Sequence, residues 1–110
     1  MAIAINRLRK YYMERINQND YSTVENIQRY IDLVELYRSM QKSIKEDGAR
    51  IEVENGSQSF IKSHPLISDM KNINAQLINL KKDIDKAVKE YELKLIEKEK
   101  SKEYTSEDLI

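Results

Sequence analysis

The sequence contains no cysteine and no tryptophan, and it has a single proline, Pro65, and a single histidine, His64. Without cysteine the chain forms no disulfide and no thiolate metal site, and one histidine among scattered carboxylates gives no spacing expected of metal ligands. No apolar run approaches the roughly 20 residues that are needed to cross a bilayer. We therefore expect an intracellular protein with no metal, no cofactor and no membrane segment.

Glycine is almost as scarce, since Gly48 and Gly56 are the only two. Their spacing does not form the glycine-rich loop that cradles phosphates, so we expect no unaided ATP hydrolysis. A nucleophile needs an adjacent base, and Ser63 beside His64 is the one candidate pair. His64 is better explained as a helix N-cap before Pro65. We expect no catalytic residue and no enzyme activity.

What the chain has in abundance is charge in helical patterns. It has 110 residues, 35% of them charged, and its aliphatic residues recur at helical spacing, which is typical of a mainly α-helical single domain. A compact monomer of this size buries only about two-thirds of its unfolded-chain surface, so a partner chain would add stability. The 19 basic and 19 acidic residues cancel overall. Their distribution is uneven, because residues 1–20 have a basic excess and residues 101–110 an acidic excess.

The pattern predicts two helices before Gly48. The first spans about residues 2–17 and is followed by a break at residues 17–20. Ser22 and Glu25 form a capping box that predicts the start of the second helix, which should run to Asp47 and stop at Gly48. The apolar faces are formed by Ile5, Leu8, Tyr12 and Ile16 in the first helix and by Ile27, Tyr30, Ile31, Leu33, Val34, Tyr37, Met40 and Ile44 in the second. The second face is broad enough to pack on more than one neighbour.

A short β-hairpin is predicted after the second helix. Asn55-Gly56 separates two short runs with strand-forming residues, and Asn-Gly is the dipeptide preferred in two-residue type I′ turns. Such a turn would place Val53 opposite Gln58 and Ile51 opposite Phe60. An isolated hairpin is marginally stable, so we expect it to dock on helices or to join hairpins of other subunits.

The third predicted helix begins at His64-Pro65, because proline suits the first helical position. Apolar residues then alternate spacings of four and three, at Leu66, Met70, Ile73, Leu77, Leu80, Ile84, Ala87 and Tyr91. This heptad seam ends at Lys94, and the polar residues 97–110 are expected to fray. The seam suits self-association, which we prefer, but an intramolecular hairpin with the second helix fits the periodicity almost equally well.

The basic first helix is the candidate nucleic-acid contact, through Arg7, Arg9, Lys10 and Arg15. In a monomer these residues are more simply a solvated face with an internal ion pair to Glu14. In a ring the same positive charge would repeat around the assembly, and phosphate binding grows with the number of contacts. Tyr11, on the polar side of the helix, is placed to stack on a base or lie along a backbone. A helix-turn-helix formed with the second helix is disfavoured, because the break has no glycine.

Three stretches carry a resemblance to a known family. They are YSTVENIQRYIDLVELYRSMQKSIKEDG, VENGSQSFIKSHP and KNINAQLINLKKDI, and they extend from Tyr21 to Ile84. In them the chain resembles the small terminase subunit of tailed bacteriophages, in the branch found in phages of low-GC Gram-positive bacteria. The most specific positions are Gly48, Glu54, Asn55, Gly56, Ser57, Gln58, Phe60, Lys62, His64 and Pro65, extended by Asn74, Gln76, Leu77 and Leu80.

The resemblance implies a role in viral DNA packaging. Small subunits of this kind form homo-oligomeric rings, bind double-stranded phage DNA, and recruit and regulate a large subunit that holds the ATPase and nuclease. The expected partners are therefore further copies of the chain, viral DNA and the terminase large subunit, in the host cell cytoplasm. Many relatives carry GLTP and an arginine after the third helix, whereas this chain reads DIDKAVKEYELKL. The resemblance therefore does not indicate how the C-terminal region meets the large subunit.

The patterns and the resemblance together divide the chain into three parts. Residues 1–20 are expected to be a basic DNA-contacting helix, residues 21–98 an oligomerisation core, and residues 99–110 a polar acidic tail. The expected oligomer contacts are Ile51, Val53, Phe60, Leu66, Met70, Ile73, Leu77, Leu80 and Ile84, and the expected turn residues are Gly48, Asn55, Gly56, His64 and Pro65. From the residues alone, a coiled-coil scaffold or adaptor with no DNA-binding role stays open.

Overall fold

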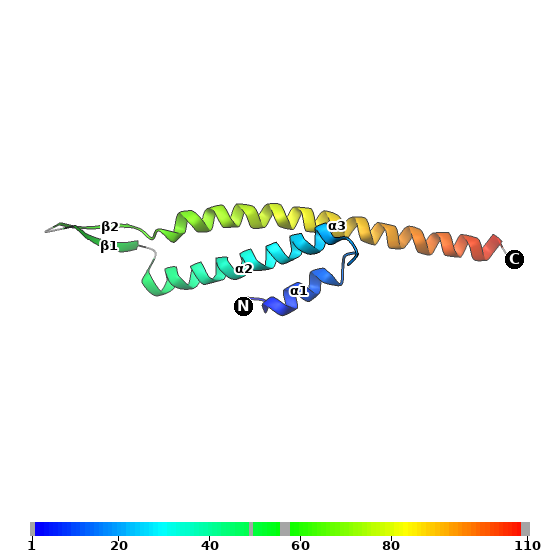
Figure 1. The fold of residues 1–110 in the computed structure, drawn as a ribbon, viewed down its shortest axis with the longest axis horizontal. Helices are drawn as coiled ribbons and strands as arrows, with labels where there is room; N and C mark the ends of the chain where they lie inside the picture. Colours follow the sequence, from blue (N-terminus) through cyan, green and yellow to red (C-terminus); the bar gives the residue numbers. More distant parts are fainter. Residues whose placement is uncertain (1, 49, 56–57, 109–110) are drawn as a thin grey trace.

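Two long helices lie side by side in opposite directions, and a pair of strands extends from one end of them (Figure 1). The computed structural model describes residues 2–48, 50–55 and 58–108, with the side chains of residues 2–48 and 64–101. The elements are α1 (Ile5–Met13), α2 (Tyr21–Asp47), β1 (Arg50–Asn55), β2 (Gln58–Ser63) and α3 (Leu66–Asp108). The mainly α-helical fold is confirmed. The molecule is elongated, with principal dimensions of 91 × 21 × 20 Å.

The core lies where α1, α2 and α3 meet. Its buried residues are Tyr12, Ile16, Ile27, Ile31 and Ile84, with Ile5, Leu8, Met13, Val24, Tyr30 and Val88 packed around them. The apolar face predicted for the first helix therefore packs inward, although α1 is shorter than the predicted residues 2–17. Ala4 is outside the helix with ψ near 139°, and Arg15 N–H bonds the Tyr12 carbonyl three residues back, so the chain turns at both ends.

The start of α2 differs from the predicted capping box of Ser22 and Glu25. The N-cap is Asp20, whose carboxylate accepts the Thr23 backbone N–H at 3.4 Å and the Thr23 hydroxyl at 2.6 Å. Glu25 instead pairs with Arg29 one turn later. The prediction was wrong by two residues because Asp20 supplies a charged acceptor that satisfies an unpaired helix N–H directly.

The end of α2 agrees with the prediction, because the helix stops after Asp47 at Gly48. Gly48 has φ 87° and ψ 156°. This conformation is more extended than the left-handed helical one, and it lies in a region essentially reserved for glycine. It turns the chain out of α2 toward β1.

The strands β1 and β2 pair antiparallel, but in a register different from the predicted one. Val53 lies opposite Phe60, and Asn55 opposite Gln58, so the predicted pairs of Val53 with Gln58 and of Ile51 with Phe60 are wrong. Asn55 belongs to the strand, and residues 56–57, which connect the strands, lie outside the described residues. Gly-Ser, with glycine first, is also compatible with a two-residue turn, so the sequence permitted both registers.

α3 packs on α2 as an intramolecular hairpin, the alternative that periodicity left open. It begins at Leu66, one residue after Pro65, and continues to Asp108. The prediction that the polar end frays from residue 97 is therefore wrong as far as residue 108. Residues 97–108 contain no glycine or proline and are rich in Glu and Lys, which are good helix formers. Within the described ranges, no helix is both long enough and apolar enough to cross a membrane.

Candidate nucleic-acid interface

α1 is anchored to the other helices by Tyr12. Its side chain is buried, and its ring meets the Tyr30 ring of α2 edge to face, with centroids 5.6 Å apart. Burial raises the pKa of the Tyr12 phenol above its usual range, and the neighbouring Tyr30 and Asp85 add to this effect. The phenol stays neutral, so Tyr12 serves as a packing anchor for α1.

A second anchor holds the segment that precedes α1. Arg38 of α2 donates from Nη1 to the Ile3 carbonyl at 2.7 Å. The sequence patterns did not single out Arg38, because this bond joins residues 35 positions apart. It fixes how the N-terminal segment and α1 lie along α2, and so it positions the basic side chains of α1.

Arg7 and Lys10 are the two basic residues of α1 that are free to bind a ligand. Arg7 is exposed at the edge of an open hollow beside Leu8 and Tyr11, and it has no hydrogen bond or ion pair within the described part of the chain. Lys10 pairs with Glu14 at 3.8 Å, and both side chains are more than half exposed. Exposed pairs of this kind contribute little, so Lys10 can exchange Glu14 for a phosphate at low cost.

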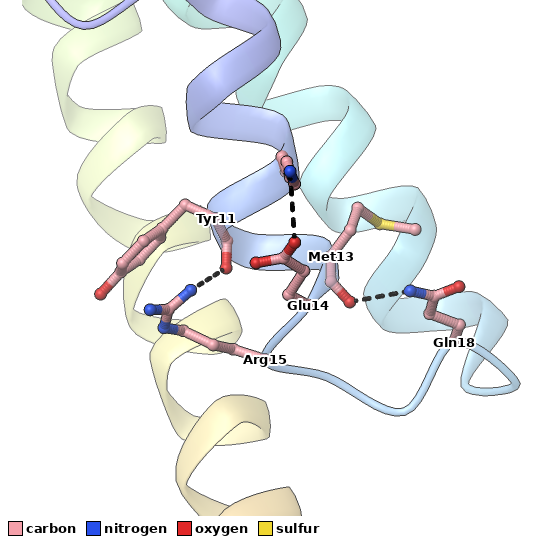
Figure 2. A network of polar contacts seen from close by, with 6 residues as sticks. Tyr11, Met13, Glu14, Arg15 and Gln18 are labelled. Carbon is pink, nitrogen blue, oxygen red and sulfur yellow. Dashed lines mark hydrogen bonds and ion pairs between the residues drawn. The ribbon is translucent and has the colours of Figure 1, made fainter.

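Arg9 and Arg15 are engaged within the protein. Arg9 donates to Asn6 Oδ1 at 3.0 Å, and its buried Nε has no hydrogen-bond partner among the described residues. Arg15 donates from Nη1 to the Tyr11 carbonyl at 2.7 Å, beside the bond from Gln18 to the Met13 carbonyl (Figure 2). These two bonds satisfy carbonyls at the end of α1, where positive charge is also favourable. Of the four predicted DNA contacts, Arg7 is unpaired among the described residues, Lys10 is in a weak exposed ion pair, and Arg9 and Arg15 are engaged within the protein.

Tyr11 is less available for stacking than its position in the sequence indicated. Its side chain is half exposed. The Arg15 guanidinium lies 3.8 Å from the centre of the ring, and the Tyr12 ring meets it edge to face at 5.1 Å. One face of Tyr11 is therefore covered by Arg15, which holds a positive charge over the ring.

His64 joins the end of α2 to the start of α3. Its ring is buried, Nδ1 accepts the Leu66 backbone N–H at 3.2 Å, and Nε2 lies 3.0 Å from Asp47 Oδ2. Because Nδ1 accepts, the proton of the neutral ring is on Nε2, which donates to Asp47. His64 therefore caps α3, as in the N-cap interpretation, and Asp47 is a partner that the sequence patterns missed.

The predicted oligomer contacts on α3 fall into two groups. Ile73 and Ile84 are buried within the chain itself, so they are not available to a second copy without unpacking. The other four, Leu66, Met70, Leu77 and Leu80, are half-buried. Ile51, Val53 and Phe60 have their backbones in the paired strands, and their side chains lie outside the described residues. Gly56 also lies outside them.

The described part of the chain is thus a long helical hairpin with the short basic helix α1 packed on its side. The sequence matches the family model described as phage terminase, small subunit, over residues 7–85, and the chain belongs to that family. The family is generally non-catalytic, and membership supports a role in phage DNA packaging. A search of curated proteins and a search of solved structures each returned no match. Among the described residues, no group of three or more His, Asp or Glu side chains is placed to hold a metal ion.

Proposed function

We propose that this chain is an oligomeric DNA-packaging adaptor that binds viral double-stranded DNA through α1 and recruits and regulates the large terminase subunit. The observation that carries the DNA-binding part is the exposed guanidinium of Arg7, which has no partner in the described part of the chain and lies one turn from the weakly paired Lys10. The family match begins at Arg7 and so includes this face of α1.

Oligomerisation raises the affinity of the basic face formed by Arg7 and Lys10 for duplex DNA. Two phosphate contacts from one chain bind DNA weakly, because the affinity depends on how many counterions the protein displaces. A ring repeats Arg7 and Lys10 once per subunit, and a linked array of weak contacts binds far more tightly than one contact. We therefore propose that assembly precedes stable DNA binding.

The test is duplex DNA binding at several salt concentrations by wild-type protein and by Arg7→Glu/Lys10→Glu. We expect affinity to fall at least tenfold and the salt dependence to become shallower, since each lost phosphate contact removes about one unit of slope. Lys81→Glu/Lys82→Glu on α3 is the matched control, because it changes the net charge equally at exposed lysines. Equal affinity and slope for wild type and the α1 variant would overturn the assignment of α1 as the DNA contact.

The proposal also assigns a role to the oligomerisation core and to the acidic C-terminal residues. Residues 21–98 form the oligomerisation core, with the hairpin bearing Ile51, Val53 and Phe60 between neighbouring subunits. The acidic residues 101–110 contact the large subunit in the host cytoplasm. A scaffold with no DNA-binding role is the second candidate, favoured by the 43-residue length of α3. An assembly that forms normally but binds no duplex DNA at low salt would identify the scaffold.

A further inference from the structure

α2 and α3 leave an apolar groove between them near the β-hairpin. The two helices diverge toward this end (Figure 1). Two adjoining hollows of about 340 and 520 Å³ lie there and share Ile44 and Met70. Tyr37 and Ile67 complete the apolar floor. Tyr37, which belongs to the apolar face predicted for the second helix, lines this groove and is only half-buried.

Lysines border the groove on both helices. Lys42 and Lys45 stand on α2 and Lys71 on α3, and all three side chains are exposed. None of them has an ion pair within the described residues. An apolar floor between positive borders is complementary to an amphipathic helix with acidic flanks.

The far end of α3 offers such a helix. From Glu92 to Ser101 every side chain is exposed, and Leu93 and Ile96, three residues apart, are 52% and 50% exposed. At 100° per residue, Glu92 and Glu99 lie on one side of the Leu93 and Ile96 stripe and Glu97 lies on the other. The three lysines of the same segment lie elsewhere: Lys94 and Lys98 point away from the stripe, and Lys100 lies on the stripe one turn beyond Ile96. The glutamates on either side of Leu93 and Ile96 are therefore the charges that would meet the lysines around the groove.

The two surfaces cannot meet within one chain. Met70 and Leu93 are on the same continuous helix, 23 residues apart, which separates them by about 35 Å at 1.5 Å per residue. The groove is near the hairpin, and residues 92–101 are toward the opposite end of the 91 Å molecule (Figure 1). Any contact between them therefore joins two copies.

We propose that the groove between α2 and α3 seats residues 92–101 of a second copy of this chain, with Leu93 and Ile96 on the apolar floor and the flanking glutamates against Lys42, Lys45 and Lys71. This proposed contact rests on the oligomer of the proposed function, and it names the two surfaces that would join neighbouring subunits. The contact is heterologous, because each copy gives a helix to one neighbour and a groove to the other. One such helix buries less than a standard stable interface, so stability comes from closure of the assembly.

The experiment is a charge exchange followed by mass measurement at micromolar concentration, without DNA. Three variants are compared with wild type: Lys42→Glu/Lys45→Glu, Glu92→Lys/Glu99→Lys, and the chain that carries all four substitutions. We expect each two-site variant to raise the apparent dissociation constant at least tenfold, because like charges then face each other. The four-site chain should assemble within about threefold of wild type, since its charges are complementary again. Lys81→Glu/Lys82→Glu is the matched control and should assemble as wild type does.

The outcomes separate this inference from the proposed function. A wild-type chain that stays monomeric overturns both this contact and the oligomer. An assembling wild type whose mass is unchanged in both two-site variants overturns this contact and leaves the oligomer standing. Loss of assembly in the two-site variants without recovery in the four-site chain also overturns the pairing. Recovery supports it and excludes misfolding, because that chain contains every substitution.

Discussion

Asp20 and Thr23 illustrate how a single residue pair sets the start of a helix. The Thr23 hydroxyl and backbone N–H both donate to the Asp20 carboxylate, and these bonds hold the pKa of Asp20 below its ordinary value of 3.8. A carboxylate at a helix N-terminus also interacts favourably with the helix dipole. Thr23 is buried in spite of its polar side chain, which its bond to Asp20 explains.

Replacing Asp20 by alanine should lower the unfolding temperature at neutral pH. The folded-state pKa of Asp20 is depressed, so its contribution is fully present above about pH 3.8 and is lost as the pH falls through the folded-state value. The measurement is thermal unfolding of wild type and Asp20→Ala at pH 7 and at successively lower pH. The difference in unfolding temperature should shrink in acid. Asn19→Ala is the control, and a constant difference at every pH would contradict the role of the ionised carboxylate.

At the scale of elements, the environment of α3 changes from one part of the helix to another. Ile84 is fully buried in the cluster where all three helices meet, Met70 borders the groove near the hairpin, and Ile96 is exposed beyond the core. The heptad pattern continues from Leu66 to Tyr91, so within that stretch the pattern alone does not distinguish a buried position from a docking position. What distinguishes them is where α1 and α2 lie against α3.

Substitution of Ile84 by alanine should destabilise the chain by about 2–5 kcal/mol, because it opens a cavity at the junction of three helices. Ile78→Ala on the same helix is the matched control, since Ile78 is half exposed. Surface substitutions of this kind usually change stability by about 0.5 kcal/mol or less. Urea unfolding followed by circular dichroism measures both. Similar losses for the two variants would contradict the position of the core.

At the scale of the whole molecule, the chain is a rod 91 Å long and 21 × 20 Å across. Its Cα radius of gyration is 22.2 Å, whereas a compact domain of this size has a radius of about 13 Å. The core cluster lies where α1 covers α2 and α3, and the hairpin and the end of α3 extend away from it (Figure 1). A rod of this shape leaves much apolar surface half exposed, which favours association with other chains.

Hydrogen exchange should follow this layout. Amides around Ile27, Ile31 and Ile84 should exchange slowest, and those of residues 95–101 fastest in dilute protein, because local opening is easiest where few apolar contacts are buried. Exchange measured by mass spectrometry at low and high protein concentration tests this. Residues 92–101 should become protected as the concentration rises. Uniform protection along α3 in dilute protein would contradict the layout.

The sequence by itself determined the helical class, the order of elements, the stop at Gly48 and the apolar faces of α1 and α2, because these depend on local periodicity and on residues with special backbone properties. The resemblance to the small terminase subunit was also present in the residues, and the match over residues 7–85 confirms the family without identifying its branch. Local pattern misplaced the α2 cap and the strand register, since the chain offered two chemically acceptable solutions at each point.

Only the tertiary structure decided how the N-terminal segment is held against α2 and which apolar residues of α3 stay uncovered. The bond from Arg38 to Ile3 and the bond from His64 to Asp47 join residues distant in sequence. Periodicity reports which face of a helix is apolar, whereas the partner that covers that face is set by how the helices pack.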